Sequence, residues 1–389
     1  MAPLVIINRM KKLLLKISAY KIVFISVAFL VILSGGCAKK DEKEIKIGAI
    51  LPLTGSAALL GTETKEGMDI AIEEINRKGG MNGQTIKVIY LDSMNDPKEG
   101  ISAFRILTEI DKVPVVISSM SSVTKALIPL ATKGKVALVA TVTAAPKITE
   151  SSEWVFRNYY TTDVQGEVLA KFVTSKLGLK KIGVLYLNDD YGVTGYHAFK
   201  KELEENGGQV VFAEGYEKTE IDLRTHILKL KTVNPEGILI VSYDNALVTA
   251  LKQIRELKIG SKLFSYSGLA DPKILQLSDT SAEGVYVTVS NYDPSNPLDI
   301  KQKEFVNAYK QKFGKLPGHY PAFGYDTVMI IAEAIKKDGY ESEKIKNALL
   351  NISNIDLVLG KISILPNREI FFPQTVKIIR TGSIMPVAQ

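Results

Sequence analysis

The chain has 389 residues, of which 46% are hydrophobic, and a formal net charge of +7. Five of its 49 basic residues and none of its acidic residues precede Cys37, so the rest of the chain carries 44 basic against 42 acidic residues and shows no charge bias toward nucleic acid. Cys37 is the only cysteine, which excludes an intrachain disulfide and a metal site built from cysteines.

Residues 1–37 have the pattern of an export signal. A basic stretch precedes a 12-residue apolar run at residues 22–33, which is short for a membrane span and has the length of a signal-peptide core. The sequence Ser-Gly-Gly-Cys at residues 34–37 resembles a lipobox, which implies that Cys37 is lipidated and becomes the mature N-terminus. Ser34 stands where that pattern has an aliphatic residue, so cleavage by an ordinary signal peptidase stays open.

Two further alternatives stay open at this end of the chain. The apolar run could be kept as an anchor helix, and Met10, which precedes two lysines, could be the true start. Residues 38–44 are mostly charged and predict a solvated tether. The 353 residues from Cys37 onward suit two domains of about 150 residues each.

The stretch at residues 45–83 is the most informative part of the chain. Residues 45–51 form a strongly apolar strand pattern, and residues 63–78 carry apolar side chains at helical spacing before two glycines end the helix. A small-residue loop joins the two. A strand that leads into a helix N-terminus in this way places backbone N–H groups at the sheet edge where α/β proteins bind ligands.

Strand and helix patterns alternate along the rest of the chain. Further strands are predicted at residues 85–92, 115–118, 137–140, 181–187, 209–216, 237–242, 262–266, 284–290, 361–365 and 375–380. Helices are predicted at residues 97–109, 121–133, 165–177, 194–206, 222–232, 245–258, 301–313, 325–338 and 344–350. This alternation predicts parallel sheets covered by helices on both faces. Residues 45–61 also match residues 180–195 as strand, turn and helix start, which favours two equivalent lobes.

The block at residues 45–83 resembles the opening of the leucine/isoleucine/valine-binding family of periplasmic binding proteins, which serve ABC importers, and the likeness runs nearly to the C-terminus. The resemblance implies the type I fold, an α/β architecture of two doubly wound parallel-sheet lobes with a hinge and a ligand cleft between them. Three crossovers are expected, near residues 157–165, 291–297 and 355–360. Lobe 1 would comprise residues 45–160 and 290–355, and lobe 2 residues 161–289 and 356–389.

The resemblance also implies partners and a location. We expect a small-molecule ligand, an ABC permease in the inner membrane as partner, no metal and no cofactor. The protein would be a monomer, held by its lipid in the periplasm or at the outer cell surface.

A hydroxyl-rich turn is the first candidate site. Residues 118–124 contain five hydroxyl side chains among seven residues, which exceeds what one helix cap needs, although any one of them could be only a cap. In the family, the matching turn places a serine hydroxyl and helix N–H groups on the ligand's carboxylate. Ser122 matches that serine, and Met120 and Ser121 would line the same wall.

The next predicted strand leads into a second candidate loop. The family pattern there is Ala-Thr-Ala-Pro, in which the threonine and nearby backbone groups hold the ligand. Counting back from Pro146 places the family threonine at Ala144, whereas this chain has Thr143 one residue earlier. We expect Val142 and Thr143 to line the site, with either a shifted loop or a missing hydroxyl contact.

Three tyrosines match family contact positions. Tyr191 and Tyr243 follow strand ends of the predicted second lobe, where the family places tyrosines facing the ligand across the cleft. Tyr320 matches a further family aromatic residue. A tyrosine at one strand end is about as often packed at the rim as in contact with a ligand, but two at equivalent ends strengthen the prediction.

Ser267 is a departure from the family pattern, because amino-acid-specific members carry a glutamate here that pairs with the ligand's α-ammonium. A hydrogen bond to a charged group contributes about 1.5–3 kcal/mol, or roughly 10- to 150-fold in affinity. Leu60 also replaces an aromatic residue that is usual in amino-acid binders. We therefore expect an apolar or aromatic carboxylate as ligand, unless Asp244 or Asp271 substitutes for the glutamate.

Signals of catalysis are absent from the sequence. It has no G-x-S-x-G, P-loop or HExxH motif, and we expect His197, His226 and His319 to be solvated. The sequence thus predicts a lipid-anchored substrate-binding protein that closes on its ligand and is not an enzyme. The alternatives are a lipoprotein that regulates a cell-envelope enzyme without binding a small molecule, and a hydrolase that uses a serine of residues 118–122.

Overall fold

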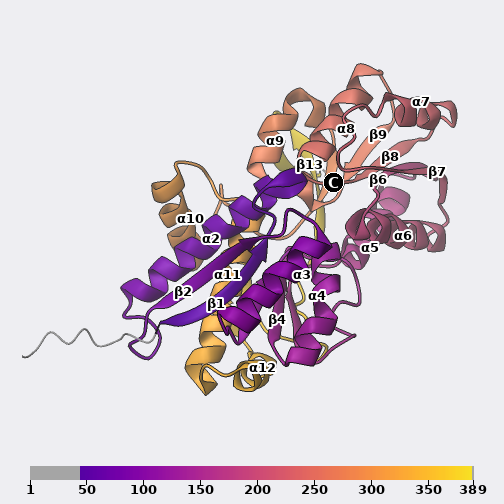
Figure 1. The fold of residues 1–389 in the computed structure, drawn as a ribbon. Helices are drawn as coiled ribbons and strands as arrows, with labels where there is room; N and C mark the ends of the chain where they lie inside the picture. The colour runs from indigo at the N-terminus through magenta and orange to yellow at the C-terminus, as the bar shows by residue number, and fades with distance from the viewer. Residues whose placement is uncertain (1–43, 388–389) are drawn as a thin grey trace, which may run out of the picture. The chain divides into compact units, whose positions relative to one another are not determined.

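The computed structural model describes residues 44–387, so the predicted signal and Cys37 lie outside the described part. Its first sheet has five parallel strands in the order β2-β1-β3-β4-β5 (Figure 1). They are β1 (Ile45–Leu51), β2 (Ile86–Asp92), β3 (Val115–Ser118), β4 (Ala137–Thr141) and β5 (Val155–Asn158). β3 and β4 are buried at every residue, as expected for strands covered on both faces.

Six helices belong with this first sheet. They are α2 (Ala58–Arg77), α3 (Pro97–Arg105), α4 (Ser121–Gly134), α10 (Ile300–Phe313), α11 (His319–Asp338) and α12 (Ser342–Leu350). A 3-10 turn at Gly55–Ala57 precedes α2, and a π-helical turn at Ile106–Ile110 extends α3. α2 packs along α11, and α3 packs along α4 (Figure 1).

The second sheet has seven strands in the order β14-β13-β10-β9-β8-β6-β7. They are β6 (Lys181–Leu187), β7 (Gln209–Tyr216), β8 (Gly237–Val241), β9 (Lys262–Ser265), β10 (Tyr286–Val289), β13 (Thr375–Arg380) and β14 (Ser383–Pro386). Its helices are α5 (Thr162–Lys171) with a π-helical turn at Phe172–Lys176, α6 (Asp190–Glu205), α7 (Arg224–Thr232), α8 (Asp244–Glu256) and α9 (Pro272–Ser278). Two 3-10 turns, Ser267–Ala270 and Asp279–Ala282, flank α9.

Both sheets have the doubly wound strand order. The parallel strands of the second sheet, β7-β6-β8-β9-β10, repeat the order of the first, and only β13 and β14 are antiparallel additions. In this topology the chain leaves the first and third strands toward opposite faces, which opens a crevice at their carboxyl ends. The predicted α/β architecture with two parallel-sheet lobes is confirmed.

The match between residues 45–61 and residues 180–195 corresponds to the same packing of a helix start against a strand end in both lobes, and it involves a glycine in each. A Cβ atom on Gly61, near the start of α2, would lie 2.0 Å from the carbonyl oxygen of Pro52. A Cβ atom on Gly192, near the start of α6, would lie 2.0 Å from the carbonyl oxygen of Leu187. Each lobe therefore begins with a strand whose end is covered closely by the next helix, and only glycine permits that distance.

α11 begins at His319, earlier than the predicted start at residue 325. Pro321 lies in the first turn, where a missing N–H costs no helical hydrogen bond. Gly324 lies within the helix, where it allows α11 to approach α2 closely. A Cβ atom at this position would lie 2.1 Å from the carbonyl oxygen of Thr64. The first turn of α11 consequently carries Tyr320.

The segment after α12 differs from the predicted lobe boundary at residue 356. A two-stranded hairpin, β11 (Ile355–Leu357) and β12 (Gly360–Ile362), follows α12, and the N–H groups of Val358 and Leu359 each donate a 2.9 Å hydrogen bond to the buried Asp326 carboxylate on α11. Further on, Glu369 pairs with the Arg157 guanidinium of β5. These contacts hold residues 357–369 with the first sheet, and the chain joins the second sheet only at β13.

Within residues 44–387, none of the helices combines the length and the apolar character that crossing a membrane requires.

The repeated glycine packing leads to a stability prediction. Gly192→Ala places a methyl group against the end of β6, so we expect a loss of about 1–3 kcal/mol in the free energy of unfolding. Gly260→Ala is the matched control, because a Cβ atom there has nothing within 4 Å. Denaturant unfolding of both variants measures the difference, and equal stability would contradict the packing argument.

Candidate functional site

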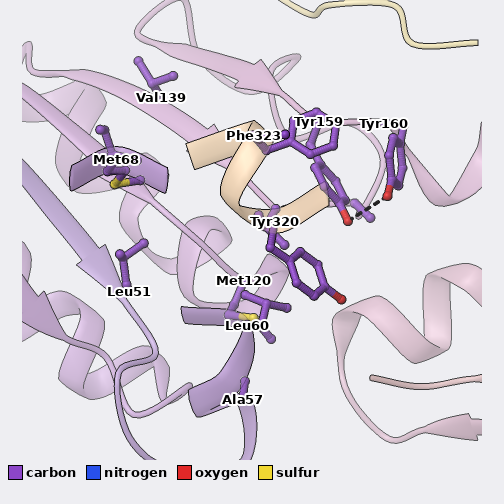
Figure 2. Close-up of a cluster of buried hydrophobic side chains, with 14 of the residues drawn as sticks. Leu51, Ala57, Leu60, Met68, Met120, Val139, Tyr159, Tyr160, Tyr320 and Phe323 are labelled. Carbon is purple, nitrogen blue, oxygen red and sulfur yellow. Dashed lines mark hydrogen bonds between the residues drawn. The ribbon is translucent and has the colours of Figure 1, made fainter. Parts of the chain in front are cut away.

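A cavity lies where the carboxyl ends of the two parallel sheets meet. It has a volume of about 30 Å³ and is lined by Leu60, Met120, Ser121, Val142, Ala144, Tyr159, Tyr191, Tyr243, Ser267, Gly268 and Tyr320. Most of these residues follow a strand end in either sheet, and Tyr320 comes from the first turn of α11. Figure 2 shows Leu60, Met120 and Tyr320 close together, although they come from distant parts of the sequence.

Seven of the nine residues predicted for the ligand site line this cavity, namely Met120, Ser121, Val142, Tyr191, Tyr243, Ser267 and Tyr320. Ser122 and Thr143 are not among the lining residues. The Thr143 hydroxyl is buried inside the first lobe, where it donates to the carbonyl oxygen of Thr141 at 3.0 Å and lies 3.2 Å from the Thr124 hydroxyl. That a ligand contacts any of these residues stays a prediction.

The start of α4 gives one wall of the cavity a positive character. Met120 occupies the N-cap position with a φ of 72°, and no side chain caps this helix. The Ser121 hydroxyl instead accepts the N–H of Ala145 at 3.1 Å. Uncapped N–H groups at a helix start, together with the helix dipole, attract an anion.

Two tyrosines form the opposite wall. The Tyr243 hydroxyl donates to Asp189 at 2.6 Å and accepts from the Asn95 amide at 2.9 Å, so it bridges residues that follow β6 and β2. Burial and then the Asp189 charge raise the pKa of Tyr243, which keeps its hydroxyl protonated. The Tyr191 ring lies beside it, with the ring centres 5.8 Å apart.

A chain of hydroxyl groups forms the third wall. The Tyr159 hydroxyl donates to Tyr160 at 3.1 Å, and the Tyr160 hydroxyl donates to the Ser267 hydroxyl at 2.7 Å. The Ser267 N–H donates to the Gln165 side chain at 3.1 Å. Burial raises the pKa of Tyr160 to about 12, so this chain is neutral.

The lining residues therefore include no ionisable acid or base apart from the tyrosines. Within residues 44–387, no group of three His, Cys, Asp or Glu side chains is arranged to hold a metal ion. The cavity offers hydroxyl groups, aromatic faces and helix N–H groups. Such a set recognises a small molecule with a polar or anionic end and an apolar body.

Three buried acids lie near the cavity without lining it: Glu63 of α2, Asp244 at the start of α8 and Asp271 before α9. Asp244 accepts the Leu60 N–H at 3.3 Å, and burial raises its pKa to about 7. Burial and then Glu63 raise the pKa of Asp271. Lys315 is the cation beside them, with its Nζ 3.0 Å from Glu63.

Further polar contacts join the loops of the two sheets. Lys125 of α4 forms an ion pair with Asp190 of α6, and Lys218 donates to the carbonyl oxygen of Asn95 at 2.8 Å. Together with the Tyr243 bond to Asn95, these contacts join the two lobes beside the cavity.

Of the histidines predicted to be solvated, His319 is buried, which corrects the prediction for that residue. Burial lowers its pKa to about 3, so the imidazole is neutral. The prediction failed because His319 directly precedes Tyr320 at the helix start, and only the tertiary packing of that turn covers it. Tyr159 was also missed as a lining residue, since it lay in a segment assigned to a crossover.

Comparisons with known proteins agree with this architecture. A family model described as periplasmic binding protein matches residues 44–376. The Leu/Ile/Val-binding protein homolog 7 of Brucella melitensis biotype 1 is 31% identical, over 83% of this chain and 84% of that protein. The leucine-, isoleucine-, valine-, threonine- and alanine-binding protein of Pseudomonas aeruginosa is 27% identical, over 78% of this chain and 82% of that protein.

Two solved structures are also similar. The leucine binding protein LivK of Thermotoga maritima superposes with a TM-score of 0.82 at 28% identity, covering 88% of this chain and 98% of that one. The branched-chain amino acid transporter substrate binding protein LivJ of Streptococcus pneumoniae, in complex with isoleucine, has a TM-score of 0.81 at 25% identity and covers 88% of this chain and 98% of that one.

The buried Asp244 leads to a pH prediction. Its pKa is about 7 in the folded state against 3.8 when exposed, so the folded state binds the extra proton, and stability is lost as the pH rises from about 4 through 7. Asp244→Asn keeps an oxygen for the Leu60 N–H and suits the φ of 45° at this position. We expect this variant to be more stable than the original protein at pH 8, by on the order of 2–4 kcal/mol, and nearly equal to it at pH 4.

Melting temperatures from pH 4 to 8 measure this effect. Asp326→Asn is the second variant, because burial raises the pKa of Asp326 to about 7 as well, but both Asp326 oxygens accept backbone N–H groups and an amide can accept only one. It should be less stable than the original protein at pH 4, and it should lose less stability than the original protein between pH 4 and pH 8. A pH-independent effect of Asp244→Asn would contradict the role given to burial.

Proposed function

Because the chain belongs to the periplasmic binding protein family, we propose that it is the extracytoplasmic substrate-binding component of an ABC importer and that its ligand is an apolar or aromatic carboxylate. The family and the relatives support a substrate-binding protein of the branched-chain amino acid type. The carboxylate ligand and the permease partner are the parts that the proposal adds.

The observation that carries the ligand class is the absence of charged side chains among the residues that line the cavity. An ammonium group moved there from water would lose its hydration without gaining a carboxylate partner. A carboxylate, in contrast, would meet the uncapped start of α4 and the hydroxyls of Ser121 and Tyr191. The site thus favours an anion without an α-ammonium group.

The proposed mechanism is closure of the hinge on the ligand. A cavity of about 30 Å³ is far below the roughly 300–1,000 Å³ of ordinary ligand pockets, so the lobes must separate before a ligand enters. Lobe 1 would hold the carboxylate at α4, and lobe 2 would contribute Tyr191, Tyr243 and Ser267 as the hinge closes. Contacts to both lobes favour the closed state, which the permease recognises.

The proposal includes the cell-envelope context. Cys37 would carry lipid and anchor the protein, as a monomer, in the periplasm or at the outer cell surface. Support for this comes only from the sequence of residues 1–37, which lie outside the described part. Mass spectrometry of the mature N-terminus tests it, and an unmodified N-terminus beyond Cys37 would contradict it.

An enzymatic role has less support. Ser118 hydrogen-bonds to Thr124, and Ser121 accepts a backbone N–H, so both hydroxyls have structural partners. Within residues 44–387, no histidine hydrogen-bonds to a serine of residues 118–122. The protein would therefore not be a serine hydrolase. The alternative of an envelope regulator without a small-molecule ligand has no specific support from the cavity, whose hydroxyl groups converge from both lobes.

A thermal-shift screen of the purified protein tests the function. We expect stabilisation by aliphatic or aromatic carboxylates that lack an amino group, by about 2.7 kcal/mol when the ligand is at 100 times its Kd. Stabilisation by amino acids alone would contradict the ligand class and keep the binding-protein function. No stabilisation across carboxylates, amino acids and amides would favour the regulator.

The role given to Ser267 makes a second prediction. Ser267→Glu supplies the carboxylate that amino-acid-specific relatives have, so we expect leucine affinity to rise by about 10- to 150-fold. Ser267→Gln is the control, because it has nearly the same size and also removes the hydrogen bond from Tyr160. Calorimetric titration with leucine compares the variants, and equal affinities for Glu and Gln would overturn the explanation based on charge.

A further inference from the structure

A second, larger cavity lies beside the first. It has a volume of about 500 Å³, within the roughly 300–1,000 Å³ of small-molecule pockets. Its walls come from the turn before α9 and α9 itself, the segment after β10, the start of α11 and the β13–β14 hairpin. Its apolar lining includes Ala270, Leu275, Val289, Leu316 and Ile384.

One hydrogen-bonded layer separates the two cavities. Ser267 lines both of them, Tyr159 lines the small cavity and Tyr160 lines the large one. The Tyr159 and Tyr160 hydroxyls are 3.1 Å apart (Figure 2), and the Tyr160 hydroxyl donates to Ser267 at 2.7 Å. The partition at this point is therefore a single row of side chains.

The geometry points to one elongated site: the small cavity takes the carboxylate head of an amphipathic ligand, and the large cavity, reached past Ser267 and Tyr160, takes its hydrocarbon tail. This inference rests on the proposed function and adds the length of the ligand to it. The ligand class is then a carboxylic acid with a chain longer than the side chain of a branched-chain amino acid.

The lining of the large cavity fits a hydrocarbon tail. His319 forms part of its wall, and burial lowers the pKa of its imidazole to about 3, so this residue adds no positive charge at neutral pH. The two charged lining residues, Asp293 and Lys377, have opposite signs and are both only half-buried, so they can stay hydrated while a tail lies along the apolar residues. The small side chain of Ser267 leaves the partition thin.

Titration of the purified protein with butanoate, hexanoate, octanoate and decanoate tests the inference. Each methylene buried in the large cavity should raise affinity about fourfold, so octanoate should bind up to about 250-fold more tightly than butanoate. The readout is the ratio of the two Kd values, measured by calorimetry within each variant.

Three variants make the test specific. Leu275→Trp on α9 and Leu316→Trp before α11 each place an indole in the large cavity and should reduce the ratio to within a fewfold of one. Leu277→Trp is the matched control, since Leu277 is 36% exposed on the same helix and does not line the cavity. It should keep the original ratio. Leu316 is 37% exposed, so its replacement gives a second plug that does not disturb the core if Leu275→Trp fails to fold.

The outcomes separate this inference from the proposed function. Short acids that bind, with no gain in affinity from butanoate to octanoate, would overturn the tail compartment and leave the carboxylate site intact. A full gain that persists in both plugged variants would also overturn it, because the tail would then lie elsewhere. No binding by any of the four acids would overturn the elongated site, whereas the proposed function is decided separately by the thermal-shift screen, which includes aromatic carboxylates.

Discussion

The direction of the parallel strands is the constraint on which the rest of the structure depends. Every strand of a doubly wound sheet delivers its loop to the same edge, so residues far apart in sequence meet there. Met120 follows β3, Val142 follows β4 and Tyr243 follows β8, and all three line one cavity. Because the topology fixes these positions, substitutions in the loops can change the ligand chemistry while the strands and helices keep the lobes unchanged.

The placement of charge follows a second rule. The buried acids of the lobe interface lie outside the cavity lining, where they cap helices or accept backbone N–H groups: Asp271 caps α9, and Asp244 accepts from Leu60. Burial raises the pKa of both carboxyl groups, that of Asp244 to about 7, so the folded state holds a proton at Asp244 more strongly than the unfolded chain does. Recognition within the cavity is left to hydroxyls and to the start of α4, which carry no net charge of their own.

The alternation of strand and helix patterns predicted the two parallel-sheet lobes, because buried strands and amphipathic helices leave a local periodic signal. The family resemblance placed seven of the nine predicted site residues around the cavity. Local sequence could not show that the Thr143 hydroxyl forms hydrogen bonds with Thr124 and Thr141 inside the first lobe. It also could not show that hydrogen bonds to Asp326 hold the segment after α12 with the first sheet. These outcomes depend on hydrogen bonds between residues that have no fixed spacing in the sequence. The start of α11 at His319 was missed for a similar reason. Gly324 lies inside this helix because α11 packs closely against α2 there, and that contact has no local signal in the sequence.

Position 267 joins the two parts of the ligand argument. A glutamate there would supply a partner for an ammonium group and would also thicken the wall between the small and the large cavity. A serine has no charge and leaves a hydrogen-bonded layer in which the Tyr160 hydroxyl donates to the Ser267 hydroxyl. The loss of the ammonium partner and the thin partition therefore have one cause. In the proposal made here, position 267 alone decides between a short zwitterion and a longer acid, because a glutamate that pairs with an amine would also block the path of a tail.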